Sequence, residues 1–336
     1  MTPGVHPGTP QEAHASPHTH SHGVVDPVTF TSARGILAVR RSFVGMIATA
    51  SLQLVVVAFT GSVALLSDTI HNFGDAATAI PLWAAFRAGR LQPNDRFTYG
   101  YGRVEDLAGI SVVAAIFVSA VLAGYVSIER LFHPQPIAYL WAVAAASVVG
   151  FLGNELVAQF RIRVGREIGS AALVADGYHA RADGLTSLAV LGGAIGVGLG
   201  LPLADPIMGL VITVAILRIL WQSGKPVLAR LLDAVDPDVV EEMRRILKGV
   251  PGVVDVTELR LRWIGHRLHA EANLAVDGAL SVEQGHEIAK EARHRLLHEL
   301  GYLSDATIHM DPTVASGEKY HGLEGHLHDD LPPHSH

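Results

Sequence analysis

The chain contains no cysteine, so it has neither a disulfide framework nor a thiolate metal site. Charged residues make up only 17% of its 336 residues, and aromatic residues only 6%. Soluble globular proteins are usually richer in charge. No Gly-x-x-x-x-Gly-Lys-Ser/Thr motif occurs, so nothing indicates ATP hydrolysis. The net charge of −7 argues against a nucleic-acid partner.

Long apolar stretches are what the chain does have. Its mean hydropathy is +0.32, and 49% of its residues are hydrophobic. Residues 1–30 have no apolar core, so we expect no cleavable signal peptide before the first of these stretches. Each stretch reaches or approaches the roughly 20 residues needed to cross a bilayer. The six expected membrane helices are 42–61, 63–86, 105–130, 137–160, 170–199 and 205–223.

Basic residues gather in every second connection between these stretches. Because positively charged loops stay in the cytoplasm, we expect an integral protein of the plasma (inner) membrane with both termini cytoplasmic. The other connections contain essentially only Arg130. The basic connections contain Arg34, Arg40 and Arg41; Arg87, Arg90, Arg96 and Arg103; Arg161, Arg163 and Arg166; and Lys225 and Arg230.

The sequence changes character near residue 231 and becomes that of a small soluble domain. Asp236-Pro237 and the capping box at Ser281 each predict the start of a helix. Three β-rich runs complete the order αββαβ. The expected organisation is a disordered, histidine-containing tail (1–34), an all-α transmembrane bundle of six helices (35–230), a cytoplasmic α+β domain (231–312) and a disordered, histidine-rich tail (313–336).

The pattern Asp-x-x-His-x-x-x-Asp occurs twice within apolar stretches. Steps of three and four residues place the polar side chains on one face of a helix. Ionisable groups at membrane depth are costly and usually mark an ion pathway or a proton relay. The alternative, helices joined by buried hydrogen bonds, would contribute only about 0.6–2 kcal/mol. The two sets are Asp68, His71 and Asp75, and Asp176, His179 and Asp183.

Four of these residues are expected near the middle of the second and fifth helices, which are antiparallel. Two imidazoles and two carboxylates suit a tetrahedral zinc site. Asp68 would lie one turn toward the outside, and Asp176 one turn toward the cytoplasm, as entry or exit acids or as proton acceptors. The four candidate metal ligands are His71, Asp75, His179 and Asp183.

These motifs make the chain resemble the cation diffusion facilitators, a family of divalent-metal/proton antiporters. The resemblance covers about residues 35–312 and includes Asp205-Pro206 at the start of the sixth helix and the αββαβ domain. It implies that the four candidate ligands form the transport site, that zinc is the main substrate, and that metallochaperone-like domains meet in a cytoplasmic homodimer.

The resemblance also implies a metal site in the cytoplasmic domain, which this sequence retains in part. Thr257 and Asn273 stand where two histidines are expected, and His269 lies on the same strand face as Asn273. The alternative is a set of surface histidines that bind no metal. In the loop after the second helix, Phe97 and Tyr101 replace expected histidines, so we expect no loop site there. The candidate cytoplasmic ligands are His269, His286, His309 and Asp311.

Two further groups of residues remain open at this point. Arg181 needs a carboxylate partner within the membrane, and Glu155, Glu105 and Asp106 are the candidates. Arg103 and Asp233 flank the junction of the two domains, either as a hinge pair or as a surface pair. We expect His266, His294 and His298 to be exposed.

The predicted function is secondary active transport, exporting a divalent cation, zinc above all, from the cytoplasm in exchange for protons. Metal must displace protons from its ligands, and histidine titrates in the physiological range. The partners are the metal ion, protons, lipid and a second copy of the chain, with no cofactor beyond the transported metal. The alternatives are a passive channel, a metal sensor that does not transport, a metalloenzyme, or transport of cobalt, cadmium, iron or manganese. No catalytic motif appears, so we do not expect an enzyme.

Overall fold

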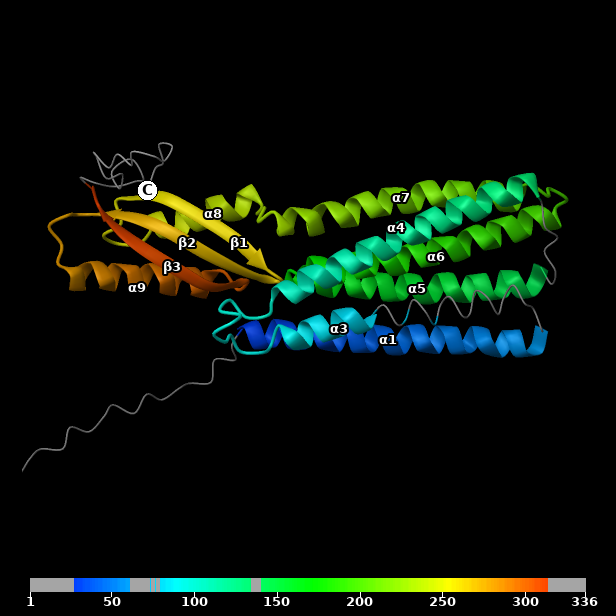
Figure 1. The fold of residues 1–336 in the computed structure, drawn as a ribbon, viewed down its shortest axis with the longest axis horizontal. Coiled ribbons are helices and arrows are strands. Elements are labelled where there is room, and N and C mark those ends of the chain that lie inside the picture. The colour runs from blue at the N-terminus through cyan, green and yellow to red at the C-terminus, as the bar shows by residue number, and fades with distance from the viewer. Residues whose placement is uncertain (1–26, 61–72, 74–75, 77–78, 134–139, 314–336) are drawn as a thin grey trace, which may run out of the picture.

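The computed structural model describes residues 27–60, 73, 76, 79–133 and 140–313. In this part of the chain, long helices run alongside one another, and a smaller α+β domain lies at one end of them (Figure 1). The bundle contains α1 (Pro27–Thr60), α3 (Ala79–Ala88), α4 (Arg103–Phe132), α5 (Leu140–Ile168), α6 (Ala171–Gly198) and α7 (Ala204–Leu231). The α+β domain contains α8 (Pro237–Lys248), β1 (Asp255–Ile264), β2 (Arg267–Val276), α9 (Val282–Glu299) and β3 (Leu303–Pro312).

Four helices in the described ranges are long and apolar enough to cross a membrane: α1 within Thr31–Val56, and the whole of α4, α5 and α7. Helix α6 has the same length as α7, 28 residues, but carries several ionisable side chains that are buried against its neighbours. Most of the expected second helix, 63–86, lies outside the described residues. The helical membrane domain is therefore confirmed, while the number of six crossings stays a prediction.

Helices α1, α4, α5 and α7 are longer than the apolar stretches that predicted them. Helix α1 begins at Pro27, so the expected disordered tail of 1–34 is wrong over its last eight positions, from residue 27 to 34. Helix α5 continues to Ile168, so that Arg161 lies within a helix and not in the predicted loop. Arginine is a good helix former. The helix ends at Gly169, where a φ of 72° suits glycine.

The expected αββαβ order is confirmed in the α+β domain. Strands β1 and β2 form an antiparallel hairpin that turns at Gly265, where φ is 63°. Strand β3 pairs in parallel with β2, because the chain crosses over through α9 before it returns. The sheet order is β1-β2-β3. Its core holds Met243 and Leu247 of α8, Leu296 of α9, and Leu268 and Leu274 of β2, all fully buried.

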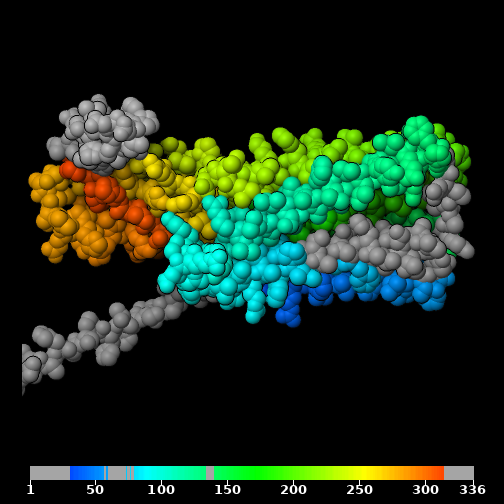
Figure 2. Space-filling model, viewed as in Figure 1, coloured from blue at the N-terminus to red at the C-terminus, as the bar shows by residue number. Residues whose placement is uncertain are grey.

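The connection between α3 and α4 packs at the junction of the two domains (cyan in Figure 2). The ring of Tyr99 in this connection lies edge-on to His269 of β2, with the ring centroids 6.3 Å apart. Arg262 of β1 stacks over the same tyrosine at 5.1 Å. Arg103 at the start of α4 donates to Asp233 at 2.8 Å, and both side chains are nearly half exposed. The pair expected from the sequence therefore exists as a surface ion pair at the junction.

Candidate metal site

Helix α6 brings together three of the predicted polar side chains. It begins after Ser170, whose hydroxyl accepts a hydrogen bond from Leu173 N at 3.1 Å. From there, Asp176, His179 and Asp183 follow at steps of three and four residues and are 0%, 2% and 6% exposed. His179 Nδ1 lies 3.9 Å from Asp183 Oδ1. The predicted polar face thus points into the bundle.

A cluster of apolar side chains from several helices packs beside this face. Ala180 of α6 packs with Ala158 of α5, Met46 of α1 and Ala76, all within one buried cluster. Ala76 is fully buried and belongs to the expected second helix. The other predicted polar residues of that helix, Asp68, His71 and Asp75, lie outside the described residues. The structure therefore describes only the part of the candidate metal site that lies on α6.

Arg161 of α5 forms an ion pair with Asp176. Arg161 Nη1 lies 3.0 Å from Asp176 Oδ2, and neither side chain has exposed surface. The second terminal nitrogen of the guanidinium, Nη2, contacts Met46 Sδ at 3.2 Å. The sequence did not reveal this pair, because Arg161 was assigned to a loop at the membrane surface. Asp176, predicted as an entry acid or a proton acceptor, thus carries its own counter-ion.

The partner of Arg181 is Glu155, one of the three carboxylates that the sequence left open. Arg181 donates from Nη2 to Glu155 Oε1 at 2.8 Å and from Nε to Oε2 at 3.1 Å. The two side chains are 32% and 25% exposed. This bidentate pair joins α5 to α6 on a face of α6 other than that of His179.

In the α+β domain, His309 and Asp311 lie together at the end of β3. His309 Nε2 is 2.8 Å from Asp311 Oδ1, and Asp311 is only 1% exposed. His309 pairs with Asn273 in the strand register. The two residues form an acidic-histidine pair on an accessible strand, with His309 at the surface.

The two remaining candidates of the cytoplasmic site lie elsewhere in the domain. His286 of α9 lines a pocket with Ile308 and Met310, whose side chains alternate along the strand with that of His309. His269 lies four residues before Asn273 on β2 and pairs with Asp305 in the strand register. Since Asn273 pairs with His309, His269 is about 13 Å along the strand from the level of His309. Its Nε2 lies 3.1 Å from Ser304 Oγ. Burial lowers the pKa of His269 below its ordinary value.

Within the described residues, no three histidine or acidic side chains are close enough together to hold a metal ion. The four cytoplasmic candidates therefore form no metal shell within one protomer. Each membrane or cytoplasmic group described so far is at most half of a coordination sphere. A metal ion bound at either group would need further ligands, from residues outside the described ranges, from a second copy of the chain or from water.

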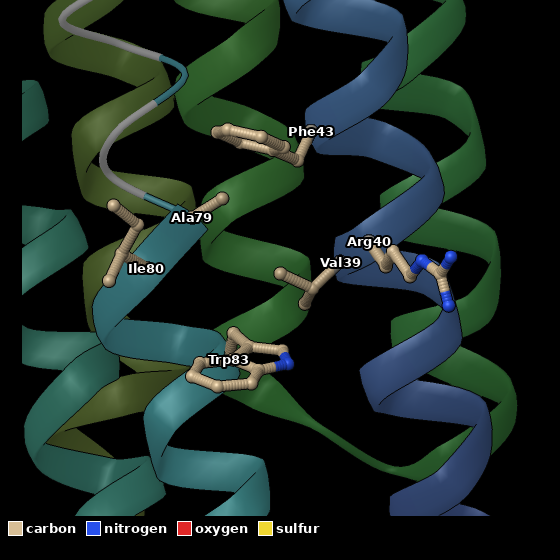
Figure 3. A pocket seen from close by; sticks show the side chains of 6 residues that line it. All are labelled: Val39, Arg40, Phe43, Ala79, Ile80 and Trp83. Atoms are coloured by element: carbon tan, nitrogen blue, oxygen red, sulfur yellow. The ribbon is translucent and has the colours of Figure 1, made fainter.

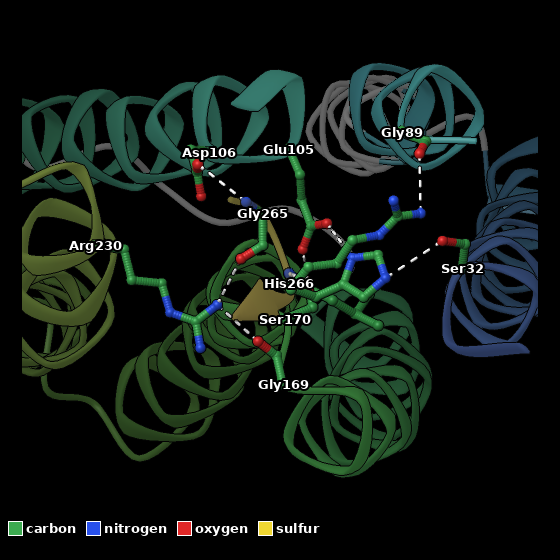
Figure 4. A network of polar contacts seen from close by, with 11 residues as sticks. Ser32, Gly89, Glu105, Asp106, Gly169, Ser170, Arg230, Gly265 and His266 are labelled. Carbon is green, nitrogen blue, oxygen red and sulfur yellow. Dashed lines mark hydrogen bonds and ion pairs between the residues drawn. The ribbon is translucent and has the colours of Figure 1, made fainter. Parts of the chain in front are cut away.

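A buried polar network that the sequence did not predict lies where the β1–β2 turn meets the helices (Figure 4). His266, expected to be exposed, is only 5% exposed. Its Nδ1 lies 2.6 Å from Glu105 Oε2 of α4, and its Nε2 lies 3.3 Å from Ser32 Oγ of α1. Ser170 donates to the other oxygen of Glu105 at 2.5 Å. The expectation for His266 is wrong because the turn is covered by the ends of several helices.

Arg230 near the end of α7 joins the same network. It donates to Gly169 O at 2.6 Å and to Gly265 O at 3.1 Å, and its guanidinium stacks over Trp263 at 4.3 Å. The N–H of Gly265 donates to Asp106 Oδ2 at 3.2 Å. The sequence features that could have indicated this network are the two carboxylates at the start of a membrane helix and the Gly-His turn between two strands.

His294 and His298 of α9 are exposed, as expected.

A hollow of about 200 Å³ between α1 and α3 differs from these polar sites (Figure 3). Its walls are Val39, Phe43, Ala79, Ile80 and Trp83, and Arg40 lies at its rim. The lining contains no carboxylate or imidazole. It therefore offers no ligands to a cation.

Known proteins show the same two-part organisation. Residues 39–232 match the family model for the cation efflux transmembrane domain, and residues 235–313 match that for the cytoplasmic domain of cation efflux proteins. A probable cation efflux system protein of Mycobacterium tuberculosis is 55% identical over 87% of this chain and 89% of its own length. The manganese efflux system protein MneP of Bacillus subtilis is 25% identical over 75% of this chain and 87% of its own length. Among solved structures, the cadmium form of a MamM CTD variant matches at 26% identity and a TM-score of 0.22, covering 23% of this chain and 95% of that one.

Proposed function

Because the chain belongs to the cation diffusion facilitator family of cation efflux proteins and is therefore a transporter of divalent metal cations, we propose that it exports zinc from the cytoplasm in exchange for protons. The observation that supports this proposal is the buried pair of His179 and Asp183 on one face of α6. Buried ionisable groups inside a membrane helix usually serve an ion pathway. The proposed transport site adds His71 and Asp75 to them.

Zinc fits the proposed ligand set better than magnesium or calcium does. Two imidazole nitrogens and two carboxylate oxygens form a tetrahedral shell of the kind zinc adopts. Magnesium and calcium prefer shells made only of oxygen. Ala76 packs beside Ala180 in the bundle interior, which agrees with a second helix that lies close to His179.

Proton exchange follows from the chemistry of the same ligands. A histidine binds metal only when neutral, so an arriving cation expels protons and protons expel the cation. Histidine performs this exchange near neutral pH. Release would take place on the more acidic side of the membrane, so an inward proton gradient drives metal outward. Helices rocking about the site would expose it to each side in turn.

The direct test is zinc flux in proteoliposomes with imposed pH gradients and a pH dye inside. We expect zinc to move against a counterflow of protons, and we expect Asp183→Ala to abolish both movements. The exposed His294→Ala variant is the control and should transport normally. Zinc flux without proton movement would favour a passive channel, and zinc binding without flux would favour a sensor.

Manganese is a second candidate substrate, because the relative from Bacillus subtilis is named for manganese efflux. Manganese is harder than zinc and prefers oxygen ligands. A transport series with zinc, manganese, cobalt, cadmium and iron(II) in the same vesicles separates the candidates. Zinc transport at least as fast as that of manganese supports the main proposal, and manganese transport alone supports the second.

We further propose that two copies associate through the α+β domain with both termini in the cytoplasm of a cell whose inner membrane holds the protein. The His309–Asp311 pair is the part of the proposed cytoplasmic metal site that supports this arrangement, because only these two candidate ligands lie side by side within the described residues of one protomer. His269 and His286 are the other proposed ligands. Light scattering of the full chain with and without zinc tests association, and His309→Ala should weaken any zinc dependence.

A further inference from the structure

The ion pair of Arg161 and Asp176 lies next to the proposed transport ligands and is buried completely. Arg161 Nη1 and Asp176 Oδ2 are 3.0 Å apart, and both side chains are 0% exposed. The pair links α5 to α6 within the bundle. No other described ion pair between an arginine and a carboxylate in the bundle has both side chains hidden from solvent to this degree.

The pair has few hydrogen bonds for a buried ion pair. Across the described residues, no hydrogen bond reaches Arg161 Nε or either oxygen of Asp176. The contact of Nη2 with Met46 Sδ is to a weak acceptor. Burying two charges costs more than their attraction returns unless further hydrogen bonds complete them. Stability alone therefore gives a poor reason for placing these two charges here.

The position of the pair gives a better reason. Asp176 precedes His179 by three residues, which is about 4.5 Å along the helix axis and on the same face. A full charge at this distance acts strongly on a divalent cation, because the interior of the bundle screens it weakly. Arg161 supplies the opposite charge that Asp176 faces at this position.

We infer that Arg161 is a fixed countercharge that neutralises Asp176 and thereby sets the affinity of the His179–Asp183 site for a divalent cation. This inference rests on the proposed function of that site. Without Arg161, the carboxylate of Asp176 adds a third acidic ligand or a near negative charge, and the metal is held too tightly for release. Without Asp176, the guanidinium faces the metal directly and repels it. Arg161 is thus a positioning residue that acts on the metal through Asp176.

The test is zinc titration of the full chain in nanodiscs, counting only the binding that Asp183→Ala removes. At pH 8, Arg161→Gln should bind zinc about tenfold more tightly and release it more slowly, whereas Asp176→Asn should bind about tenfold more weakly. The double variant, which contains neither charge, should return to within about threefold of the native affinity. Arg161→Lys retains the charge and should behave in the same way as the native chain.

The Arg181–Glu155 pair is the matched control, because it joins the same two helices away from the His179 face. Arg181→Gln and Glu155→Gln should not shift zinc affinity in opposite directions. If Arg161→Gln and Asp176→Asn both weaken zinc binding, or if the double variant is as weak as Asp176→Asn, the pair is only structural and the inference is overturned. If Arg161→Gln and Asp176→Asn fail to fold, the double variant and Arg161→Lys decide the question: zinc affinity within about threefold of native in both supports the inference, and a double variant that binds about tenfold more weakly overturns it.

The outcome for Asp183→Ala separates this inference from the proposed function. Native zinc binding and flux in Asp183→Ala would overturn both, because the site itself would then be elsewhere. Loss of binding and flux in Asp183→Ala, combined with no response to the charge series, would overturn only the role of Arg161.

Discussion

His266 Nδ1 lies 2.6 Å from Glu105 Oε2, so a turn between two strands of the α+β domain is bonded to the first turn of a membrane helix. Both side chains are about 95% buried, at 5% exposure each. Ser32 and Ser170 occupy the remaining positions around the pair and bring α1 and the start of α6 into contact with it. The two domains therefore meet through buried, specific polar contacts that join the hairpin to three helices.

Replacing His266 should destabilise the full chain. His266→Ala leaves the Glu105 carboxylate buried without its main partner, which should cost about 3 kcal/mol. The double variant with Glu105→Gln should recover part of that loss, since the carboxylate that lost its partner is then gone. Thermal unfolding in detergent measures both, and His294→Ala on the exposed face of α9 should change little. If His266→Ala and the native chain unfold at the same temperature, the contact between His266 and Glu105 does not contribute to stability.

Replacing His179, a proposed transport ligand, should change the metal preference. His179→Asp converts a nitrogen ligand to an oxygen ligand, which harder ions such as manganese prefer. We expect the ratio of zinc to manganese transport to fall by about tenfold or more. Competition flux assays in vesicles measure this ratio, with His298→Asp in α9 as the control. An unchanged ratio would mean that His179 does not contact the transported ion.

The contact of α5 with α6 at Gly177 should be intolerant of any side chain. A Cβ at Gly177 would lie 2.6 Å from Ile162 Cγ1 and 2.9 Å from Ile162 N, so the helices must separate. Gly177→Ala should cost about 1–3 kcal/mol and slow transport, because Asp176 and His179 move with the backbone. Gly285→Ala is the control: nothing lies within 4 Å of a Cβ there, and alanine should stabilise α9 by up to about 1 kcal/mol.

His269 should contribute to stability that is lost in mild acid. Burial holds its pKa below the ordinary value of 6.5, so the unfolded chain takes up a proton there more readily than the folded chain does. The contribution is present above about pH 6.5 and declines as the pH falls below it. Between pH 7.5 and 5.5, His269→Asn should therefore lose less thermal stability than the native chain. The exposed His294→Asn should show the native decline, and the same decline in His269→Asn would contradict this account.

The sequence predicted the buried polar face of α6, because the information for it is local. Steps of three and four residues define one face of a helix, and apolar neighbours indicate that the face is buried. Helix ends were less predictable. Hydropathy marks where an apolar stretch ends, and the predicted stretch ended at residue 160. Helix α5 continues to Ile168, so that Arg161 lies in the helix and forms an ion pair with Asp176.

The contacts at the junction of the two domains could not be predicted from the sequence, for a different reason. Nothing near His266 in the sequence shows that Glu105, 161 positions away, covers it. That contact depends on how a hairpin docks onto the helices, which is tertiary information. The partner of Arg181 is an intermediate case: charge compensation in the membrane limited the choice to three carboxylates, and packing of α5 on α6 selected Glu155.

The two-residue connection between α5 and α6 holds the adjoining ends of these helices together at the junction, so any tilt of α6 would turn about that point as a pivot. Gly169 is bonded to Arg230, and Ser170 to Glu105, so the pivot has little freedom to translate. Helix α6 extends from there for 28 residues, or about 42 Å. A tilt of about 10° at the pivot would displace the far end by roughly 7 Å and the level of His179 by less than half of that. The proposed transport site would therefore move much less than the far end of α6.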